Sequence, residues 1–219
     1  MQLLAVNVGL PQDLTWQDIT IKTAIVKNTV AGPVMVRKLN LEGDGQADLR
    51  VHGGETKAVY GYGAQHYEFW QSELSRPMLP WGSFGENLTI EGLDENDIQI
   101  GDQFRIGEAI LMAREPRKPC NTLAIRLQQA DIIERFLFSM RSGVYFSVVQ
   151  EGKVQAGDVV EKIHCESHGI TVSDVIRLDI VDREDEEGLH RASQITLLPE
   201  KWRNRFRQRL EGLKSRPKI

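Results

Sequence analysis

Short apolar runs separated by glycine-containing breaks dominate the first two-thirds of the chain. Gly9 and Gly32 fall in such breaks, as turns between strands would require. Strands this short are typical of an antiparallel, barrel-like sheet rather than of alternating βα units. The punctuation over residues 98–107 predicts a hairpin that leads towards Cys120. The strand-like runs are residues 3–8, 19–26, 34–41, 57–62 and 104–112.

Two stretches of the same region follow the period of a helix instead. Residues 65–74 place Phe69, Trp70 and Leu74 where they can pack on the sheet. Residues 122–138 carry apolar side chains at helical spacing throughout, which predicts one continuous helix. We therefore predict an α+β fold in which a β-barrel is flanked by helices.

From Thr171 onwards the sequence changes to helix-forming residues. Thr171 and Asp174 resemble a capping box that opens a helix ending near residue 178. A second helix is predicted over residues 184–193, with acidic residues in its first turn. Pro199 begins a third helix, whose apolar face consists of Trp202, Phe206, Leu210 and Leu213.

The change in pattern predicts two domains. Residues 1–167 would form the barrel domain, and residues 168–219 a small three-helix domain docked through Trp202 and Phe206. The last helix also carries many basic residues on its other faces. For these a solvated surface is favoured over recognition of an acidic partner.

Composition narrows the class of protein. With 219 residues, 41% of them hydrophobic, the chain can bury one good core. A net charge of −4 argues against binding along nucleic acid. Two cysteines cannot make a disulfide framework, and we find neither a signal peptide nor a run long enough to span a bilayer. We expect a cytoplasmic protein that binds neither nucleic acid nor membrane.

The stretch over residues 113–121 holds the most promising chemistry. Pro116 and Pro119 should end a strand in a stiff loop that presents Cys120. Surrounding positive charge lowers a thiol pKa and makes the thiolate available as a nucleophile or metal ligand. An ordinary small buried cysteine stays an equal alternative. The cations are Arg114, Arg117 and Lys118.

Two glycine-rich stretches accompany this loop, at residues 43–54 and 81–88. Glycine allows a ligand to approach the main chain closely. In a flat strand Asp48 and His52 would lie ~13 Å apart, whereas a turned geometry would bring them together. From the pattern alone, a turn-capping aspartate and an ordinary loop histidine are favoured over a functional pair.

Taken in order, these motifs resemble the MOSC family (molybdenum cofactor sulfurase C-terminal domain proteins). The resemblance is to the bacterial branch with an appended three-helix domain, typified by 6-N-hydroxylaminopurine resistance proteins. It implies a β-barrel fold that holds the molybdenum cofactor, a molybdopterin, with a cysteine thiolate on the metal. Cys120 matches that cysteine. The motifs lie at residues 43–48, 51–54, 57–60, 81–88, 100–102 and 116–120.

The resemblance also implies roles for other residues. Asp48 and His52 would join Cys120 in the catalytic pocket, which requires the turned geometry. Two departures from the branch, at Asn121 and at residues 140–146, put the shape of the substrate pocket in doubt. The implied cofactor-binding residues are Arg50, Gly53, Gly54, Lys57, Tyr60, Glu86, Asn87, Arg117 and Lys118.

The resulting hypothesis is a molybdenum-cofactor-dependent reductase that removes oxygen from N-hydroxylated compounds such as base analogues. His52, oriented by Asp48, would shuttle protons. A separate flavin reductase would supply electrons, since the sequence shows no Rossmann fingerprint. Two alternatives stay open: a metal-free Cys-His-Asp hydrolase or transferase, and a non-enzymatic carrier of the cofactor or sulfur. A homodimer is likewise left open.

Overall fold

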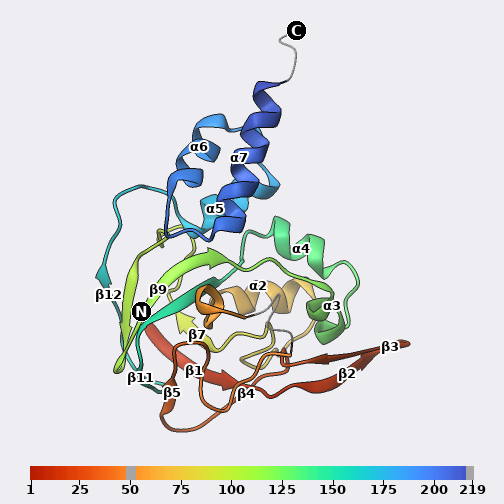
Figure 1. The fold of residues 1–219 in the computed structure, drawn as a ribbon. Helices are drawn as coiled ribbons and strands as arrows, with labels where there is room; N and C mark the ends of the chain where they lie inside the picture. Colours follow the sequence, from red (N-terminus) through yellow and green to blue (C-terminus); the bar gives the residue numbers. More distant parts are fainter. Residues whose placement is uncertain (48–52, 216–219) are drawn as a thin grey trace.

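The computed structural model describes residues 1–47 and 53–215 and has a mixed α+β architecture (Figure 1). Sheets and short helices form the larger part of the molecule, and three helices stack on it near the C-terminus, as predicted. Among the described residues, no helix is long and apolar enough to cross a membrane.

An eight-stranded sheet forms the frame, with strand order β12-β8-β9-β10-β6-β7-β1-β4. Its neighbours pair antiparallel except for β6 and β7, which run parallel. The strands are β1 (Gln2–Val8), β4 (Asn28–Thr29), β6 (Val59–Gly63), β7 (Leu88–Glu91), β8 (Gln103–Ile106), β9 (Ala109–Pro116), β10 (Val144–Gln150) and β12 (Val160–His164).

The predicted closed barrel is not found. Within the described residues, β1 approaches the β12 end of the sheet through one isolated bridge, Gln2↔Val159, and no strand ladder closes the ring. Backbone hydrogen bonds of 2.9 Å, from Leu3 N to Asp158 O and from Val160 N to Met1 O, flank this bridge. The chain turns just before β12, with Gly157 at φ 97°, so only one residue pair comes into register.

Two smaller sheets lie beside the frame. One is the hairpin of β2 (Gln12–Trp16) and β3 (Ile19–Thr23), which projects from the body (Figure 1). The other pairs β5 (Val34–Val36) with β11 (Gly152–Val154). The predicted hairpin over residues 98–107 is wrong in register, because β8 instead pairs with β9 and residues 99–102 form a turn closed by Asp102 N and Gln99 O.

The helices beside the sheet are shorter than predicted in one place. Helix α2 (His66–Glu73) lies where expected. The single helix predicted over residues 122–138 is instead two helices, α3 (Asn121–Leu127) and α4 (Ile132–Phe138). Gln128 adopts a left-handed conformation with φ 48° and caps α3, which ends the first helix although the apolar spacing continues.

The C-terminal helices are α5 (Val172–Ile180), α6 (Glu186–Gln194) and α7 (Glu200–Lys214). The predicted capping box is confirmed, with Asp174 N donating to Thr171 Oγ1 at 3.0 Å. Trp202 and Phe206 belong to the same buried hydrophobic cluster as the sheet residues Leu111 and Phe146. The three helices therefore share a core with the sheet; the exact boundary at residue 167 stays a prediction.

Candidate functional site

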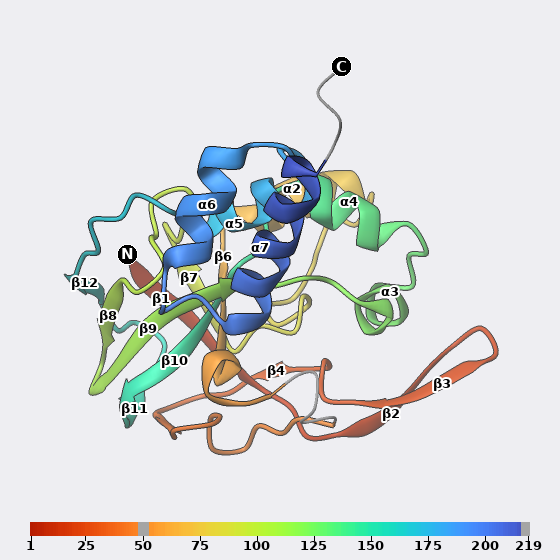
Figure 2. The same cartoon turned by 45° about the horizontal axis from the view of Figure 1, so that its top comes forward.

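A pocket of about 870 Å³ lies between the sheet and α7. Such a volume suits a drug-sized ligand, for which pockets of roughly 300–1,000 Å³ are usual. Its wall combines segments far apart in sequence: the end of the β2–β3 hairpin, residues 44–47, the loop over residues 115–120 and the start of α7. In Figure 2 the start of α7 lies above the short orange helix η1 (Glu55–Lys57), which also contributes to the wall.

Cys120 lies on this wall at the junction of β9 and α3. Strand β9 ends at Pro116, as the two prolines predict. Cys120 is the N-cap of α3 with extended backbone and is half-buried. Partial positive charge at a helix N-terminus favours a thiolate, so the position suits a nucleophile or a metal ligand.

Arg117 supplies a fixed positive charge beneath the pocket. Its guanidinium is buried, donates to the Phe84 carbonyl and lies 4.9 Å from the Tyr60 ring centroid. Burial alone would lower its pKa, but Tyr60, Tyr145 and Cys120 raise the pKa well above its ordinary value. Tyr60 is itself held in place, because its hydroxyl donates to Ser142 O at 2.8 Å.

An ion pair that the sequence did not suggest supports the floor. Lys27 Nζ lies 2.5 Å from Asp44 Oδ1, and both side chains are nearly inaccessible to solvent. Burial lowers the pKa of Lys27, which Asp44 partly offsets. Asp44 Oδ2 also accepts from Asn87 Nδ2 at 2.9 Å, while Asn87 Oδ1 accepts from Tyr60 N at 3.0 Å. Asn87 thus reaches the pocket wall, but its amide is engaged in holding β6.

Glu86 lies behind the wall rather than on it. Its carboxylate accepts hydrogen bonds from Gly82 N at 2.8 Å and Thr89 Oγ1 at 3.0 Å, and from the Tyr67 hydroxyl. Burial raises the pKa of Glu86. Its partners are the loop and strand around it, so the geometry gives Glu86 a role in shaping the glycine-rich loop.

The remaining described candidates differ in their access to the pocket. Gly54, with φ 93°, is the N-cap of η1; neither Gly53 nor Gly54 is among the described lining residues. Lys57 does line the pocket, and burial lowers its pKa to about 8, with Glu115 opposing the shift. Lys118 Nζ lies 2.6 Å from Asp179 Oδ2 of α5.

Asp48, Arg50 and His52 lie outside the described residues. Their proximity to Cys120, and the turned geometry that would bring Asp48 and His52 together, stay predictions.

Helix α7 contributes a wall of the pocket that sequence reasoning assigned to solvent. Lys201 and Arg205 line the pocket, together with Trp202. Trp202 Nε1 donates to the buried Glu115 carboxylate at 2.8 Å, and Lys201 Nζ lies 2.7 Å from the same carboxylate. The spacing of these residues could have separated a pocket face from a solvent face, but only the packing of α7 shows where the pocket is.

The pocket is strongly cationic although the chain is acidic overall. Among the described residues that line it, seven side chains are cationic and two are carboxylates, against a net charge of −4 for the whole chain. A local excess of this kind attracts and holds anions. The cations are Lys22, Lys27, Lys57, Arg117, Lys118, Lys201 and Arg205, and the carboxylates are Asp44 and Glu115.

Comparison with known proteins places this chain in a family. The family model described as MOSC domain matches residues 48–161, just over half of the chain. The model described as YiiM-like, 3-alpha helix domain matches residues 170–213.

Individual relatives agree with both matches. The uncharacterized protein YflK of Bacillus subtilis (strain 168) is 38% identical over 211 residues, covering 96% of this chain and 95% of that protein. Protein YiiM of Escherichia coli (strain K12) is 34% identical over 193 residues, covering 87% of this chain and 86% of that protein. A protein named Reductase from Gibberella moniliformis (strain M3125 / FGSC 7600) is 31% identical over 143 residues, covering 64% of this chain but 25% of that protein.

A solved structure extends the likeness to three dimensions. The crystal structure of YiiM from Geobacillus stearothermophilus superposes with a TM-score of 0.80 at 29% identity, covering 95% of this chain and 98% of that chain. The sheet and the C-terminal helices therefore follow one shared fold. The chain belongs to the MOSC family and carries, after its MOSC domain, the three-helix domain of YiiM-like proteins.

Proposed function

We propose that this protein is a molybdenum-cofactor-dependent reductase of N-hydroxylated compounds, with base analogues of the 6-N-hydroxylaminopurine type as its substrate class. The observation that carries the proposal is Cys120 at the start of α3, on the wall of a cationic pocket. Membership of the MOSC family and the relative named Reductase support it.

The residues present fit the cofactor. Cys120 would supply the soft sulfur donor that suits a molybdenum centre with dithiolene ligands. Arg117 and Lys118 would supply cations for the anionic pterin phosphate, and Lys57 a further amine whose pKa is lowered to about 8. When bound, the cofactor provides a metal that exchanges two electrons with a substrate.

The proposed reaction requires the pocket to receive electrons and to deliver protons. Reduction of R–NHOH to R–NH2 and water breaks the N–O bond and consumes two electrons and two protons. We assign proton delivery to His52, with Asp48 fixing its tautomer. The electrons come from a separate flavin reductase. Buried Arg117 contributes an unchanging positive charge, so it orients anionic groups without exchanging protons.

Metal analysis and turnover test the proposal together. Protein purified natively from a host that makes the cofactor should contain molybdenum and pterin in proportion to protein. With a chemical electron donor it should convert 6-N-hydroxylaminopurine to adenine. Metal-free protein that hydrolyses esters or amides would favour the Cys-His-Asp hydrolase, whereas loaded protein without any reductase activity would favour the carrier; either result would overturn the proposal.

A further inference from the structure

All four tyrosines of the chain lie in one connected series of aromatic rings. Tyr145 and Tyr60 both line the pocket, and their ring centroids lie 4.9 Å apart. The ring of Tyr62 follows 6.1 Å from Tyr60, and that of Tyr67 follows 6.1 Å from Tyr62. Trp81 completes the series, with its ring 4.5 Å from that of Tyr67. These five residues form the aromatic row, in which neighbouring rings lie close enough for an electron to pass between them.

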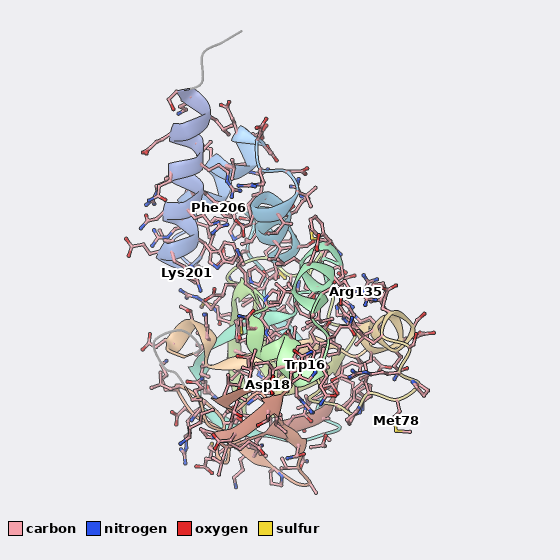
Figure 3. The ribbon with its side chains drawn as sticks, turned by 90° about the vertical axis from the view of Figure 1, so that its right-hand side faces the viewer. Trp16, Asp18, Met78, Arg135, Lys201 and Phe206 are labelled. Atoms are coloured by element: carbon pink, nitrogen blue, oxygen red, sulfur yellow. The ribbon has the colours of Figure 1, made fainter. Side chains whose placement is uncertain are left out.

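The aromatic row has two accessible ends and a closed middle. Tyr62 and Tyr67 are 0% and 2% exposed, whereas Tyr145 is half-buried where it meets the pocket. Trp81 is half-buried as well, but it is not among the described residues that line the pocket. Three residues before it, Met78 is 80% exposed, and Figure 3 shows Met78 at the edge of the molecule. The row therefore leads from the pocket through the core to a separate part of the surface.

Tyr67 has a partner that can take up its phenolic proton. A buried tyrosine that loses an electron must also lose this proton, because otherwise it becomes an uncompensated buried cation. The Tyr67 hydroxyl donates to the Glu86 carboxylate, which is itself inaccessible to solvent. Burial raises the pKa of Glu86, so this carboxylate accepts a proton more readily than an exposed one does. Ser83 N donates to the same hydroxyl at 3.2 Å and helps to orient it.

The inner tyrosines have partners that are poorer proton acceptors. Tyr60 donates to Ser142 O at 2.8 Å, and the Tyr62 hydroxyl accepts from Trp70 Nε1 at 2.7 Å. A carbonyl oxygen is a weak base, and an indole N–H is a donor only. Burial also raises the pKa of Tyr60 and Tyr62 well above the ordinary value, so both keep their protons. A missing electron would therefore pass over Tyr60 and Tyr62 and settle at Tyr67.

We propose that the aromatic row carries oxidising equivalents, one electron at a time, from the pocket to the surface at Trp81. Its activity is to protect the pocket from oxygen-centred radicals. The inference rests on the proposed function for the source of these radicals, since a reductase that passes a single electron to a peroxide generates them.

The electron balance closes at both ends of the row. A peroxide, ROOH, that takes one stray electron splits into hydroxide and the radical RO•, which takes a hydrogen atom from the Tyr145 hydroxyl and leaves as ROH. An electron from Tyr67 and a proton from pocket water restore Tyr145, while the proton of Tyr67 passes to Glu86. At the surface, ascorbate reduces the Tyr67 radical through Trp81. Ascorbate loses one electron and one proton, and the proton held by Glu86 returns to Tyr67.

A photochemical oxidant fixed in the pocket tests the row directly. Full-length Cys165→Ser protein from a host without the cofactor has one thiol, Cys120, to which a ruthenium polypyridyl complex is attached. Flash excitation with an oxidative quencher produces ruthenium(III), a strong one-electron oxidant, in the pocket that Tyr145 and Tyr60 line. Electron paramagnetic resonance should detect a tyrosyl radical. Transient absorption should show that it forms in a first-order phase that slows in D2O, because the proton of Tyr67 moves with the electron.

Substitutions along the row locate the radical and its exit. Tyr62→Phe keeps the ring but replaces it by one that is much harder to oxidise, so the fast phase should be lost. Tyr67→Phe should abolish the slowing in D2O, because the tyrosine beside Glu86 is gone. Trp81→Phe should leave formation of the radical unchanged but lengthen its lifetime in the presence of ascorbate. Trp16→Phe, on the β2–β3 hairpin outside the row, is the matched control and should behave as the parent protein.

Thermal melts check that each variant is folded. Unchanged kinetics in folded Tyr62→Phe, or equal reduction by ascorbate in Trp81→Phe and Trp16→Phe, would overturn the proposal. None of these measurements needs molybdenum or turnover, so the row can fail independently of the reductase hypothesis.

Cofactor-loaded protein tests the protective role. Tyr67 is not among the described residues that line the pocket, so Tyr67→Phe and Trp16→Phe should show equal initial turnover. With hydrogen peroxide and ascorbate present, Tyr67→Phe should lose activity sooner than Trp16→Phe. Equal rates of inactivation would mean that the row does not protect the pocket.

Discussion

Cys120 owes its position to its neighbours on both sides. Pro116 ends β9, and α3 begins directly after the cysteine, so the thiol has little freedom along the chain. Arg117 is held from below by the Phe84 carbonyl and by the Tyr60 ring. A soft donor on a stiff loop beside a permanent cation would suit the anionic metal cofactor of the proposed function.

Cys120→Ser should abolish reductase activity and lower molybdenum content while leaving the fold intact. The substitution replaces a half-buried sulfur by oxygen, a poorer ligand for a soft metal, and leaves a side chain of nearly the same size. Activity and metal content per protein are measured together, with a thermal melt to check folding. The exposed Cys165→Ser is the matched control and should behave as wild type. Normal turnover by folded, loaded Cys120→Ser would remove Cys120 from the metal site.

At this scale the sequence predicted some residues and missed others for a physical reason. Proline and basic residues beside Cys120 are local signals, and Arg117, Lys118 and Cys120 all line the pocket. The Lys27–Asp44 pair joins residues from two different loops, and nothing local pairs them. Glu86 looked like a pocket residue because it lies in a glycine-rich motif, yet its oxygens point to that loop's own backbone.

Among the elements, α5 and α7 hold the loop that carries Cys120. Lys118 of the loop, Arg205 of α7 and Arg209 of α7 all contact the Asp179 carboxylate of α5. A carboxylate without solvent access needs such partners, since an uncompensated buried charge is costly. Asp179 thereby fixes the distance between the cysteine loop and the three-helix domain.

Asp179→Asn should lower the free energy of unfolding by about 2–4 kcal/mol, somewhat less than the full cost of a broken buried pair because Lys118 and Arg205 are partly solvated. Urea unfolding measures the change. Asp182→Asn removes a surface carboxylate that pairs with Arg177, and it should cost less than about 1 kcal/mol. Equal losses in the two variants would mean that Asp179 does not act as a buried tether.

The capping box of α5 predicts a dependence on pH. Burial alone would raise the pKa of Asp174, but the bonds from Thr171 and Arg177 outweigh it and hold the pKa below its usual range. A carboxylate with a lowered folded-state pKa stabilises the protein above its unfolded-state pKa, about 3.9. The advantage of wild type over Asp174→Asn, measured by urea unfolding, should therefore be full at pH 6 and shrink as the pH falls below about 4. A constant difference down to pH 2 would contradict this.

Prediction of the helices and strands succeeded where apolar periodicity determines the element. It failed where the conformation of a single residue determines it. The apolar spacing and capping signals were enough to predict α2, α5, α6 and α7. The division between α3 and α4 depends on the left-handed conformation of Gln128, for which glutamine gives no signal. Similarly, the pairing of β8 with β9 could not be distinguished from a hairpin shifted by a few residues, since both use the same glycine breaks.

Considered as a whole, the protein is a curved sheet whose pocket is completed by its last helices (Figure 1). Trp202 and Phe206 share the hydrophobic cluster of the sheet, and Trp202 also hydrogen bonds to Glu115 of β9. The three-helix domain is therefore part of the core as well as of the pocket wall.

A chain ending at residue 167 should lose the helices that complete the pocket and part of the hydrophobic core. Circular dichroism should show less helical signal, and the thermal transition should broaden or fall in temperature because the sheet residues around Trp202 become exposed. A chain ending at residue 215 keeps every described helix and is the control. An unchanged, cooperative melt for the shorter chain would show that the helices are dispensable for folding.

The meeting of Gln2 and Val159 has a consequence for the dynamics of the molecule. Strands β1 and β12 meet through one residue pair and a few flanking hydrogen bonds, so they can separate there without disturbing any full ladder, and local opening should begin at this contact. In hydrogen–deuterium exchange, the amides of Leu3 and Val160 should exchange sooner than those of the β9–β10 ladder, although Leu3 is fully buried. Slow exchange at both places would instead mean that the contact between β1 and β12 opens only by global unfolding.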